Sequence, residues 1–205
     1  MTAQIALVVV AALVLIAIVL SSMARRLDRL HRRETTSRAT LETQLVHRAE
    51  AALVLVEEAD LDPASALIIR DAAWRAAFTA PRLVGEEAAD PEQRGLVESE
   101  LTRALRTGLG DTEAQRALAQ AGPDAARALE QLAHTQYRVE LARRFHNDAV
   151  TQIQYIRRTR IVRLFRLAGR AALPQTFEMD QALEVLRIGD DTASGSADSP
   201  APPPA

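Results

Sequence analysis

An uncharged, apolar amino-terminal segment constrains this chain more than any other feature. Residues 1–24 contain no charged side chain, and residues 5–20 consist only of Ile, Ala, Leu and Val. A helix needs about 20 predominantly apolar residues to cross the hydrocarbon core of a bilayer. Residues 1–24 are therefore predicted to form a transmembrane anchor, to which the rest of the chain is tethered.

The charges beside this segment predict its orientation. The apolar run is followed directly by Arg25, Arg26, Arg29, Arg32 and Arg33. Arginines clustered beside a span stay on the cytoplasmic side. We therefore predict a single-pass protein of the cell membrane with its amino terminus outside and residues 25–205 in the cytoplasm. In the alternative orientation, the helical part lies outside the cytoplasm.

A cleaved signal peptide is the main alternative to an anchor, because Ser22-Met23-Ala24 has the small-x-small pattern of a cleavage site. A signal peptide, however, begins with a basic stretch and has an apolar core of about 7–15 residues. Here no basic residue precedes a longer apolar run, which favours a retained anchor.

Composition excludes several classes of function. The net charge of −2 argues against a nucleic-acid partner, and the absence of cysteine excludes disulfides and a lipid-modified cysteine. All 25 basic residues are arginine, which together with the alanine richness suggests a bacterial genome. Aromatic residues make up 3%, and no segment shows the alternation of a half-buried strand. The fold is therefore predicted to be all-α.

Breakers divide the soluble part into four predicted helices, which are residues 25–60, 63–80, 91–108 or somewhat beyond, and 124–168. Asp62-Pro63 and Asp90-Pro91 each pair a capping residue with a proline at the first helical position, and Gly108 and Gly110 end the third helix. Short connections favour an elongated antiparallel up-and-down four-helix bundle over residues 25–180. Residues 181–205 are predicted to be a mostly disordered tail, since their composition cannot bury enough apolar surface.

Two apolar stripes are expected to form the core of this bundle. Residues on one helical face recur every three or four positions. On the first helix the stripe consists of Leu41, Leu45, Val46, Ala49, Ala52, Leu53 and Val56. On the last helix it consists of Leu132, Val139, Ala142, His146, Ala149, Val150, Ile153 and Ile156.

A second group of arginines lies at the end of the last helix, which returns toward the membrane in an up-and-down bundle. The predicted lipid-facing residues are Arg25, Arg26, Arg29, Arg158, Arg163, Arg166 and Arg170. An arginine near an anionic leaflet contributes about 1 kcal/mol of attraction to lipid headgroups. The alternative is a solvated face that Glu86, Glu87 and Asp90 partly neutralise.

Four segments carry a family resemblance. Residues 135–150 read TQYRVELARRFHNDAV, and residues 45–56 read LVHRAEAALVLV. Residues 98–105 read ESELTRAL, and residues 171–180 contain Pro174 and Phe177-Glu178 near their end. In this order, behind an anchor, the segments resemble the LemA family over roughly residues 27–180. The resemblance implies a membrane-anchored helical bundle with no accepted catalytic centre.

The chain departs from the family pattern in three places. An early tryptophan is replaced near Arg38, and His146 stands where a tyrosine is common. The Phe-Pro break late in the last helix is missing between Tyr155 and Leu167. The chain therefore looks like a divergent member, in which the last helix is expected to continue uninterrupted into its arginine-rich end.

No catalytic, cofactor or metal site is predicted. The four histidines form neither HExxH nor a pair of Glu-x-x-His motifs. Glu130 and His134 are one turn apart, which is more often a surface contact than half of a metal site. His146 is predicted to be a hydrogen-bonded core histidine. Arg143 and Asn147 flank the apolar stripe, where we favour an edge hydrogen bond that fixes helix register over a polar docking patch for a partner.

Three functions in different classes remain. The favoured one is a non-enzymatic, membrane-anchored scaffold or adaptor whose bundle binds an unknown protein partner. Self-association through Ala17 and Ser21, a small-xxx-small pair in the span, is a further expectation. The second function is a sensor of anionic lipid surfaces that acts through the arginines, and the third is an enzyme with an unrecognised site.

Overall fold

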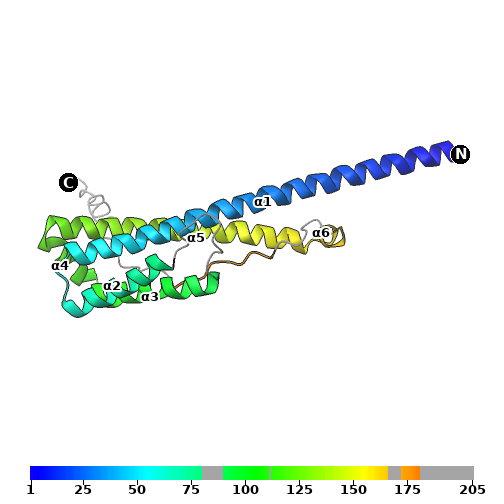
Figure 1. Cartoon of the computed structure of the whole chain (residues 1–205). Helices are drawn as coiled ribbons and strands as arrows, with labels where there is room; N and C mark the ends of the chain where they lie inside the picture. The colour runs from blue at the N-terminus through cyan, green and yellow to red at the C-terminus, as the bar shows by residue number, and fades with distance from the viewer. Residues whose placement is uncertain (80–89, 111, 166–171, 181–205) are drawn as a thin grey trace, which may run out of the picture. The chain divides into compact units, whose positions relative to one another are not determined.

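The computed structural model describes residues 1–79, 90–110, 112–165 and 172–180. Its helices are α1 (Thr2–Glu58), α2 (Pro63–Phe78), α3 (Pro91–Leu109), α4 (Thr112–Ala121), α5 (Pro123–Arg158) and α6 (Arg160–Leu164), shown in Figure 1. Within these ranges there is no strand, so the predicted all-helical fold is confirmed: the long apolar amino-terminal helix packs with other helices in a helical bundle. The predicted tail at residues 181–205 lies outside the described residues.

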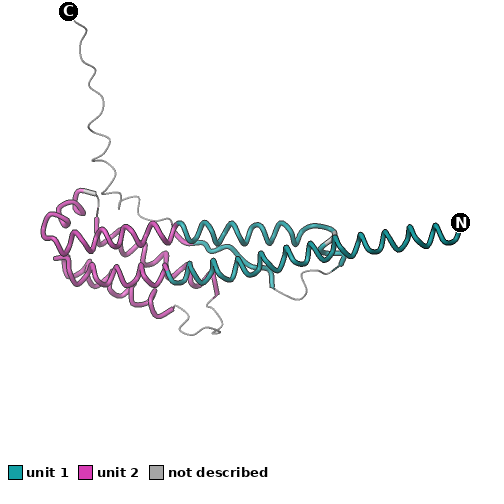
Figure 2. The backbone as a smooth tube through the Cα atoms, turned by 90° about the horizontal axis from the view of Figure 1, so that it is seen from above, with its two compact units in different colours: residues 1–43, 141–178 teal, residues 44–140, 179–205 magenta. Residues whose placement is uncertain are grey.

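The chain divides into two compact units (Figure 2). Unit 1 consists of residues 1–43 and 141–178, and unit 2 of residues 44–140 and 179–205. Helices α1 and α5 each contribute to both units.

Helix α1 continues without a break from the apolar segment into the helix predicted for residues 25–60, and it runs from Thr2 to Glu58. Its amino-terminal part is long and apolar enough to cross a membrane or to serve as a signal sequence. The large apolar side chains from Ile5 to Val19 have exposed fractions of 43 to 71%. The sequence contains no proline or glycine before residue 63, which explains the continuity.

The predicted helix boundaries at aspartate-proline pairs are confirmed. The Asp62 carboxylate accepts hydrogen bonds from the backbone N–H groups of Ala64 and Ser65 at 3.0 and 3.1 Å, and Pro63 opens α2. Asp90 caps α3 in the same way through the N–H of Glu92. Gly110 ends α3 with a φ of 67°, a conformation that glycine adopts without steric cost.

The prediction of one uninterrupted last helix over residues 124–168 is wrong. Helix α5 ends at Arg158, the N–H of Thr159 bonds to the carbonyl of Ile156, and the short helix α6 follows. The break allows Val162 to be buried with Leu27, so tertiary packing overrides the local helical pattern. Residues 166–168 of the predicted helix lie outside the described residues. Helix α4 was not predicted as a separate element.

The core of unit 2 is formed by small and medium apolar side chains from α1, α2, α3 and α5. Alanine is frequent in it, which allows close approach of the helices. At Gly108 of α3, an added Cβ would lie 2.7 Å from the Cδ1 atom of Ile69 on α2. An alanine at this position would therefore require the Ile69 side chain to move.

The core of unit 1 is smaller and groups Leu27, Ile153, Ile156 and Val162, with Met23 and Leu30 packed against it.

The two predicted stripes are largely confirmed. All eight stripe residues of the last helix are buried, and on α1 only Val46 and Leu53 are half-buried. Residues 172–178 form a non-helical segment that runs back along α5 (orange in Figure 1).

Candidate functional site

Exposed arginines of two segments lie in unit 1, and we call them the arginine surface: Arg25, Arg26 and Arg29 of α1, Arg158 at the end of α5 and Arg163 of α6. Val162 of α6 is buried in one cluster with Leu27 of α1, which places α6 near the turns of α1 that follow the apolar segment. Of the predicted lipid-facing residues, five are exposed: Arg25, Arg26, Arg29, Arg158 and Arg163. Arg166 and Arg170 lie outside the described residues. The acidic residue within residues 25–33 is Asp28, which pairs with Arg32 at 3.0 Å. The arrangement gathers exposed positive charge suited to binding anions.

Of the three acidic residues expected to neutralise this surface partly, the structure describes Asp90. Glu86 and Glu87 lie outside the described residues. Asp90 belongs to unit 2, where its carboxylate caps α3.

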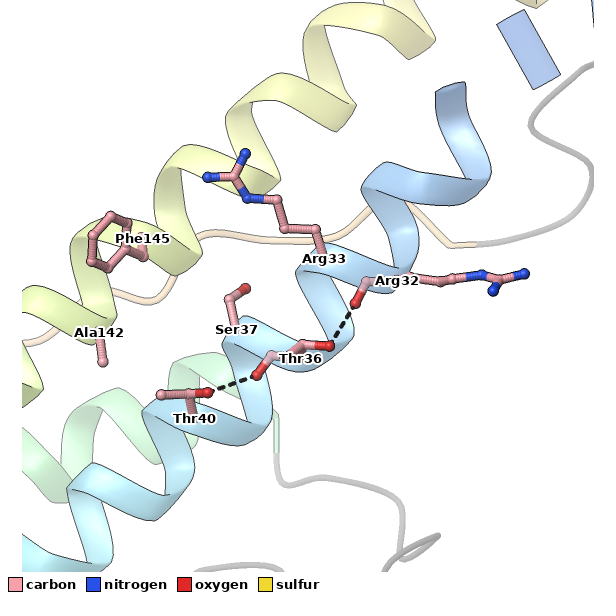
Figure 3. A pocket seen from close by; sticks show the side chains of 7 residues that line it. All are labelled: Arg32, Arg33, Thr36, Ser37, Thr40, Ala142 and Phe145. Atoms are coloured by element: carbon pink, nitrogen blue, oxygen red, sulfur yellow. Dashed lines mark hydrogen bonds between the residues drawn. The ribbon is translucent and has the colours of Figure 1, made fainter. Parts of the chain in front are cut away.

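An open recess of about 390 Å³ adjoins the arginine surface between α1 and α5 (Figure 3). It is lined by Arg32, Arg33, Thr36, Ser37, Thr40, Ala142 and Phe145. The hydroxyls of Thr36 and Thr40 donate to the carbonyls of Arg32 and Thr36, both at 3.0 Å. The Arg33 side chain reaches toward α5, whereas that of Arg32 points away. The recess therefore has few groups left to orient a polar ligand.

Asn147 holds the backbone of residue 177. Its amide nitrogen donates to the carbonyl of Phe177 at 3.1 Å, and its amide oxygen accepts the N–H of Phe177 at 2.8 Å. Two further residues of α5 donate to the same segment: Gln154 to the carbonyl of Pro174 at 2.9 Å and Arg157 to that of Ala172 at 2.7 Å. Arg143 is half-buried. The structure does not place Arg143 in the same hydrogen-bonded set.

His146 is buried beside α1 and the 172–178 segment. Its Nδ1 lies 3.4 Å from the hydroxyl oxygen of Ser37, which itself donates to the carbonyl of Glu34 at 2.9 Å. Burial lowers the pKa of His146, while Glu34 raises it and Arg38 lowers it further; a hydrogen bond with the backbone of Gln175 and the charge of Glu42 both raise it. The neutral imidazole is therefore the form that the fold favours.

Sequence reasoning missed a buried ionic cluster in unit 2, formed by Arg48, Arg94 and Glu98, whose side chains are at most 1% exposed. The two carboxylate oxygens of Glu98 lie 2.9 Å from Arg48 Nη2 and 2.6 Å from Arg94 Nη1. Burial lowers the pKa of Arg48, an effect opposed by Glu98 and reinforced by Arg94.

This ionic cluster connects four helices. Arg48 of α1 also donates to Thr102 and Gln136 at 3.2 Å each and to the backbone carbonyl of Glu98 at 2.8 Å. Arg94 of α3 donates to the carbonyl of Ala76 on α2 at 2.9 Å. A signal was present in the sequence, because Arg48 lies within the apolar stripe of α1, three residues after Leu45. A charge on a stripe indicates a buried partner, but the stripe alone does not identify that partner.

Helix α2 presents an exposed apolar face that sequence reasoning also missed. Leu67, Trp74 and Phe78 are 66, 48 and 57% exposed, and the rings of Trp74 and Phe78 stack with centroids 5.1 Å apart. The three residues recur at helical spacing on the side opposite Ile69 and Ala73, which are fully buried. We call them the aromatic face; exposed apolar groups of this kind mark interaction surfaces.

Among the described residues, no group of three or more His, Cys, Asp or Glu side chains is arranged to hold a metal ion. Glu130 and His134 are both exposed on α5.

Comparison of the chain with models of protein families, with curated proteins and with solved structures finds no match. The resemblance to the LemA family therefore rests on the four sequence segments alone.

Proposed function

We propose that this protein is a non-enzymatic scaffold of the bacterial cell membrane, in which a LemA-like helical bundle recruits a protein partner. The observation that carries the proposal is the aromatic face of α2. Tryptophan is enriched among residues that dominate binding energy at interfaces, and the only tryptophan of the chain stacks here on Phe78, partly exposed.

The anchor is supported by the exposed apolar side chains of residues 5–19. Such a surface is unstable in water, and the uncharged helical residues 4–24, at about 1.5 Å per residue, are about as long as the roughly 30 Å of hydrocarbon in a bilayer. The arginines that follow the segment support a cytoplasmic location for the bundle. The alternatives remain a cleaved signal sequence and an extracytoplasmic bundle.

The proposed architecture is an elongated, antiparallel, up-and-down four-helix bundle behind this anchor. Within unit 1, Leu27 packs with Ile153 and Ile156, whereas Ser37, further along α1, contacts His146, earlier in α5. This pairing supports an antiparallel arrangement of the two long helices. The shared core of α1, α2, α3 and α5 in unit 2 supports the number of helices.

A second candidate function is the sensing of anionic lipid surfaces. The burial of Val162 in one cluster with Leu27 favours it, because this cluster gathers the arginine surface beside the apolar segment. Lipid attraction and partner recruitment use different residues, so each can be removed separately.

Site-specific photo-crosslinking in cells tests the scaffold. A photoreactive amino acid at position 74 is expected to give a discrete heavier adduct that disappears when Phe78 is replaced by serine. The matched control is the same amino acid at Glu57, an exposed position of α1 in the same unit. Absence of an adduct at position 74, or the same adduct at position 57, would overturn the proposal.

Extraction and labelling test the anchor and its orientation. The full-length chain should resist alkaline carbonate extraction and retain its amino-terminal residues by mass spectrometry. A cysteine at Ser194 provides the only thiol. Labelling by an impermeant maleimide only after lysis agrees with a cytoplasmic bundle, whereas labelling in intact cells reverses the orientation.

A further inference from the structure

Asp180 is fixed close to the aromatic face of α2, within unit 2. Its backbone N–H donates to the hydroxyl of Ser99 on α3 at 2.9 Å. The next residue of α3, Glu100, pairs with Arg75 of α2 at 3.0 Å. Since Arg75 directly follows Trp74, the residues that come after Asp180 begin near the aromatic face.

The sequence after Asp180 includes a proline-rich stretch. Residues 199–205 read SPAPPPA, and four of the five residues 200–204, which we call the proline segment, are proline. Successive prolines favour the polyproline II helix, whose backbone is largely set before binding and loses little entropy when it docks. Proteins bind such segments with surfaces lined by aromatic side chains. The aromatic face is a surface of this kind.

The aromatic face and the proline segment match in length. From Leu67 to Phe78 the face extends about 16 Å along α2, at about 1.5 Å per residue. Five residues of a polyproline II helix, at about 3.1 Å each, cover about 15 Å. Residues 181–199 can span up to roughly 60 Å, which is long enough to bring the proline segment onto the face.

The charges beside the two surfaces are complementary. Arg70 is exposed and lies beside the aromatic face on the helical wheel of α2. The proline segment is preceded by Asp190, Asp191 and Asp198, and residues 188–205 contain no basic side chain. Opposite charge of this kind attracts the stretch before the prolines toward α2 and away from acidic surfaces.

We propose that the proline segment docks on the aromatic face of α2 in the same molecule. The inference rests on the proposed function, in which this face binds a partner, and adds that the chain's own prolines compete for it. Tethering through residues 181–199 gives an effective concentration on the order of millimolar, so weak contacts are enough to occupy the face. A partner then binds with an affinity reduced to the fraction of molecules in which the face is open.

Trp74 itself reports this contact, because it is the only tryptophan of the chain. Acrylamide quenching of its fluorescence, in the full-length chain in detergent, measures how accessible the ring is. The test variant combines Pro202→Ser, Pro203→Ser and Pro204→Ser. Its quenching constant should be at least about twofold higher than that of the unmodified chain, as expected if the face is closed in half of the molecules or more.

The matched control combines Thr192→Ala, Ser194→Ala and Ser196→Ala. It changes three residues of the same stretch without touching the prolines or the aspartates, so the quenching constant should stay at that of the unmodified chain.

An added peptide measures the competition directly. A fluorescent peptide of residues 196–205, SADSPAPPPA, should bind the triple proline variant at least about twofold more tightly than the unmodified chain in fluorescence anisotropy. Adding Leu67→Ala to the triple variant truncates an exposed side chain of the face and should weaken peptide binding by about fivefold.

Equal quenching constants in the unmodified chain and the triple proline variant, or no peptide binding to that variant, would overturn the proposal. Quenching of the unmodified chain that increases on dilution would also overturn it, because a second copy would then supply the prolines. These measurements involve no partner protein. Proline-dependent quenching without a crosslinked adduct at position 74 would therefore remove only the scaffold, whereas an adduct with proline-independent quenching would remove only this inference.

Discussion

The two units use arginine in opposite ways. In unit 2, Arg48 and Arg94 are buried and both pair with Glu98; Arg48 also donates to Gln136 of α5, and Arg94 donates to the carbonyl of Ala76 on α2. In unit 1, Arg25, Arg26 and Arg163 are exposed on a small core. A buried guanidinium forms its hydrogen bonds and ion pairs within the fold, whereas an exposed guanidinium can bind another molecule.

This difference separates residues that specify the fold from residues that serve recognition. Burying charge costs several kcal/mol per ion and is compensated only when every partner is in place. The ionic cluster of unit 2 therefore fixes which faces of α1, α2 and α3 meet. The arginine surface imposes no such requirement, so its charges can be changed at little cost to folding.

The largest expected effect is the loss of the shared carboxylate. Glu98→Ala leaves two buried arginines without their anion, and we expect the free energy of unfolding to fall by about 3–5 kcal/mol. Urea titration followed by circular dichroism measures it. The matched control is Glu100→Ala on the same helix, since Glu100 pairs with Arg75 at an exposed site and should change stability by at most about 1 kcal/mol.

A triple replacement sharpens this result. With Arg48→Met, Arg94→Met and Glu98→Leu together, no unpaired charge remains, and stability should recover to near the original value or above it. A triple variant as unstable as Glu98→Ala would show that packing volume, not the unpaired charge, causes the loss.

Removal of charge from the arginine surface should reduce lipid binding without unfolding the protein. For a chain lacking residues 1–24, Arg158→Gln with Arg163→Gln is expected to weaken binding to phosphatidylserine vesicles by about 2 kcal/mol, or roughly 30-fold. Vesicle flotation at low salt measures it. Arg70→Gln with Arg116→Gln changes the same net charge at exposed positions of unit 2 and is the control. Equal losses of vesicle binding in both double variants would show that net charge alone, and not the position of the arginines, determines the binding.

The next largest expected effect is the loss of the hydrogen bonds of Asn147. Asn147→Ala removes both bonds to the backbone of Phe177, and we expect a loss of about 1–3 kcal/mol in thermal or urea unfolding. Asp148→Ala, at an exposed position next in sequence, is expected to have little effect. Unchanged stability of Asn147→Ala together with lost partner capture would favour the docking patch over the register role.

The features predicted from the sequence are those that local patterns determine. Asp62-Pro63 and Asp90-Pro91 start helices because a cap and a proline act within one turn. The apolar stripes were predictable because helical periodicity decides which residues share a face. The aromatic face of α2, which was missed, obeys the same periodicity, but periodicity alone does not indicate which of two apolar sides of a helix is buried.

The remaining features depend on contacts between distant residues. Arg48 and Glu98 are separated by 50 positions, and nothing near either one identifies the other. The helix break at Thr159 follows from burial of Val162, which the continuous helical pattern of residues 124–168 hides. Residues 172–178 form no regular element, because side chains of α5 form hydrogen bonds with their backbone. Their sequence therefore has no helical or strand periodicity from which the segment could be predicted.

The smallest expected effect is a pH dependence that belongs to unit 1. Because burial lowers the pKa of His146 below its ordinary value of 6.5, the unfolded chain takes up a proton at a higher pH than the folded chain. Stability is therefore complete above about pH 6.5 and declines as pH falls toward the lowered pKa, with Glu34 and Glu42 limiting the decline. His146→Gln should flatten stability across this window, whereas His134→Gln, at an exposed position of unit 2, should not. Urea midpoints measured between pH 7.5 and 5 test both variants, and an unaltered slope in His146→Gln would assign the pH dependence to other groups.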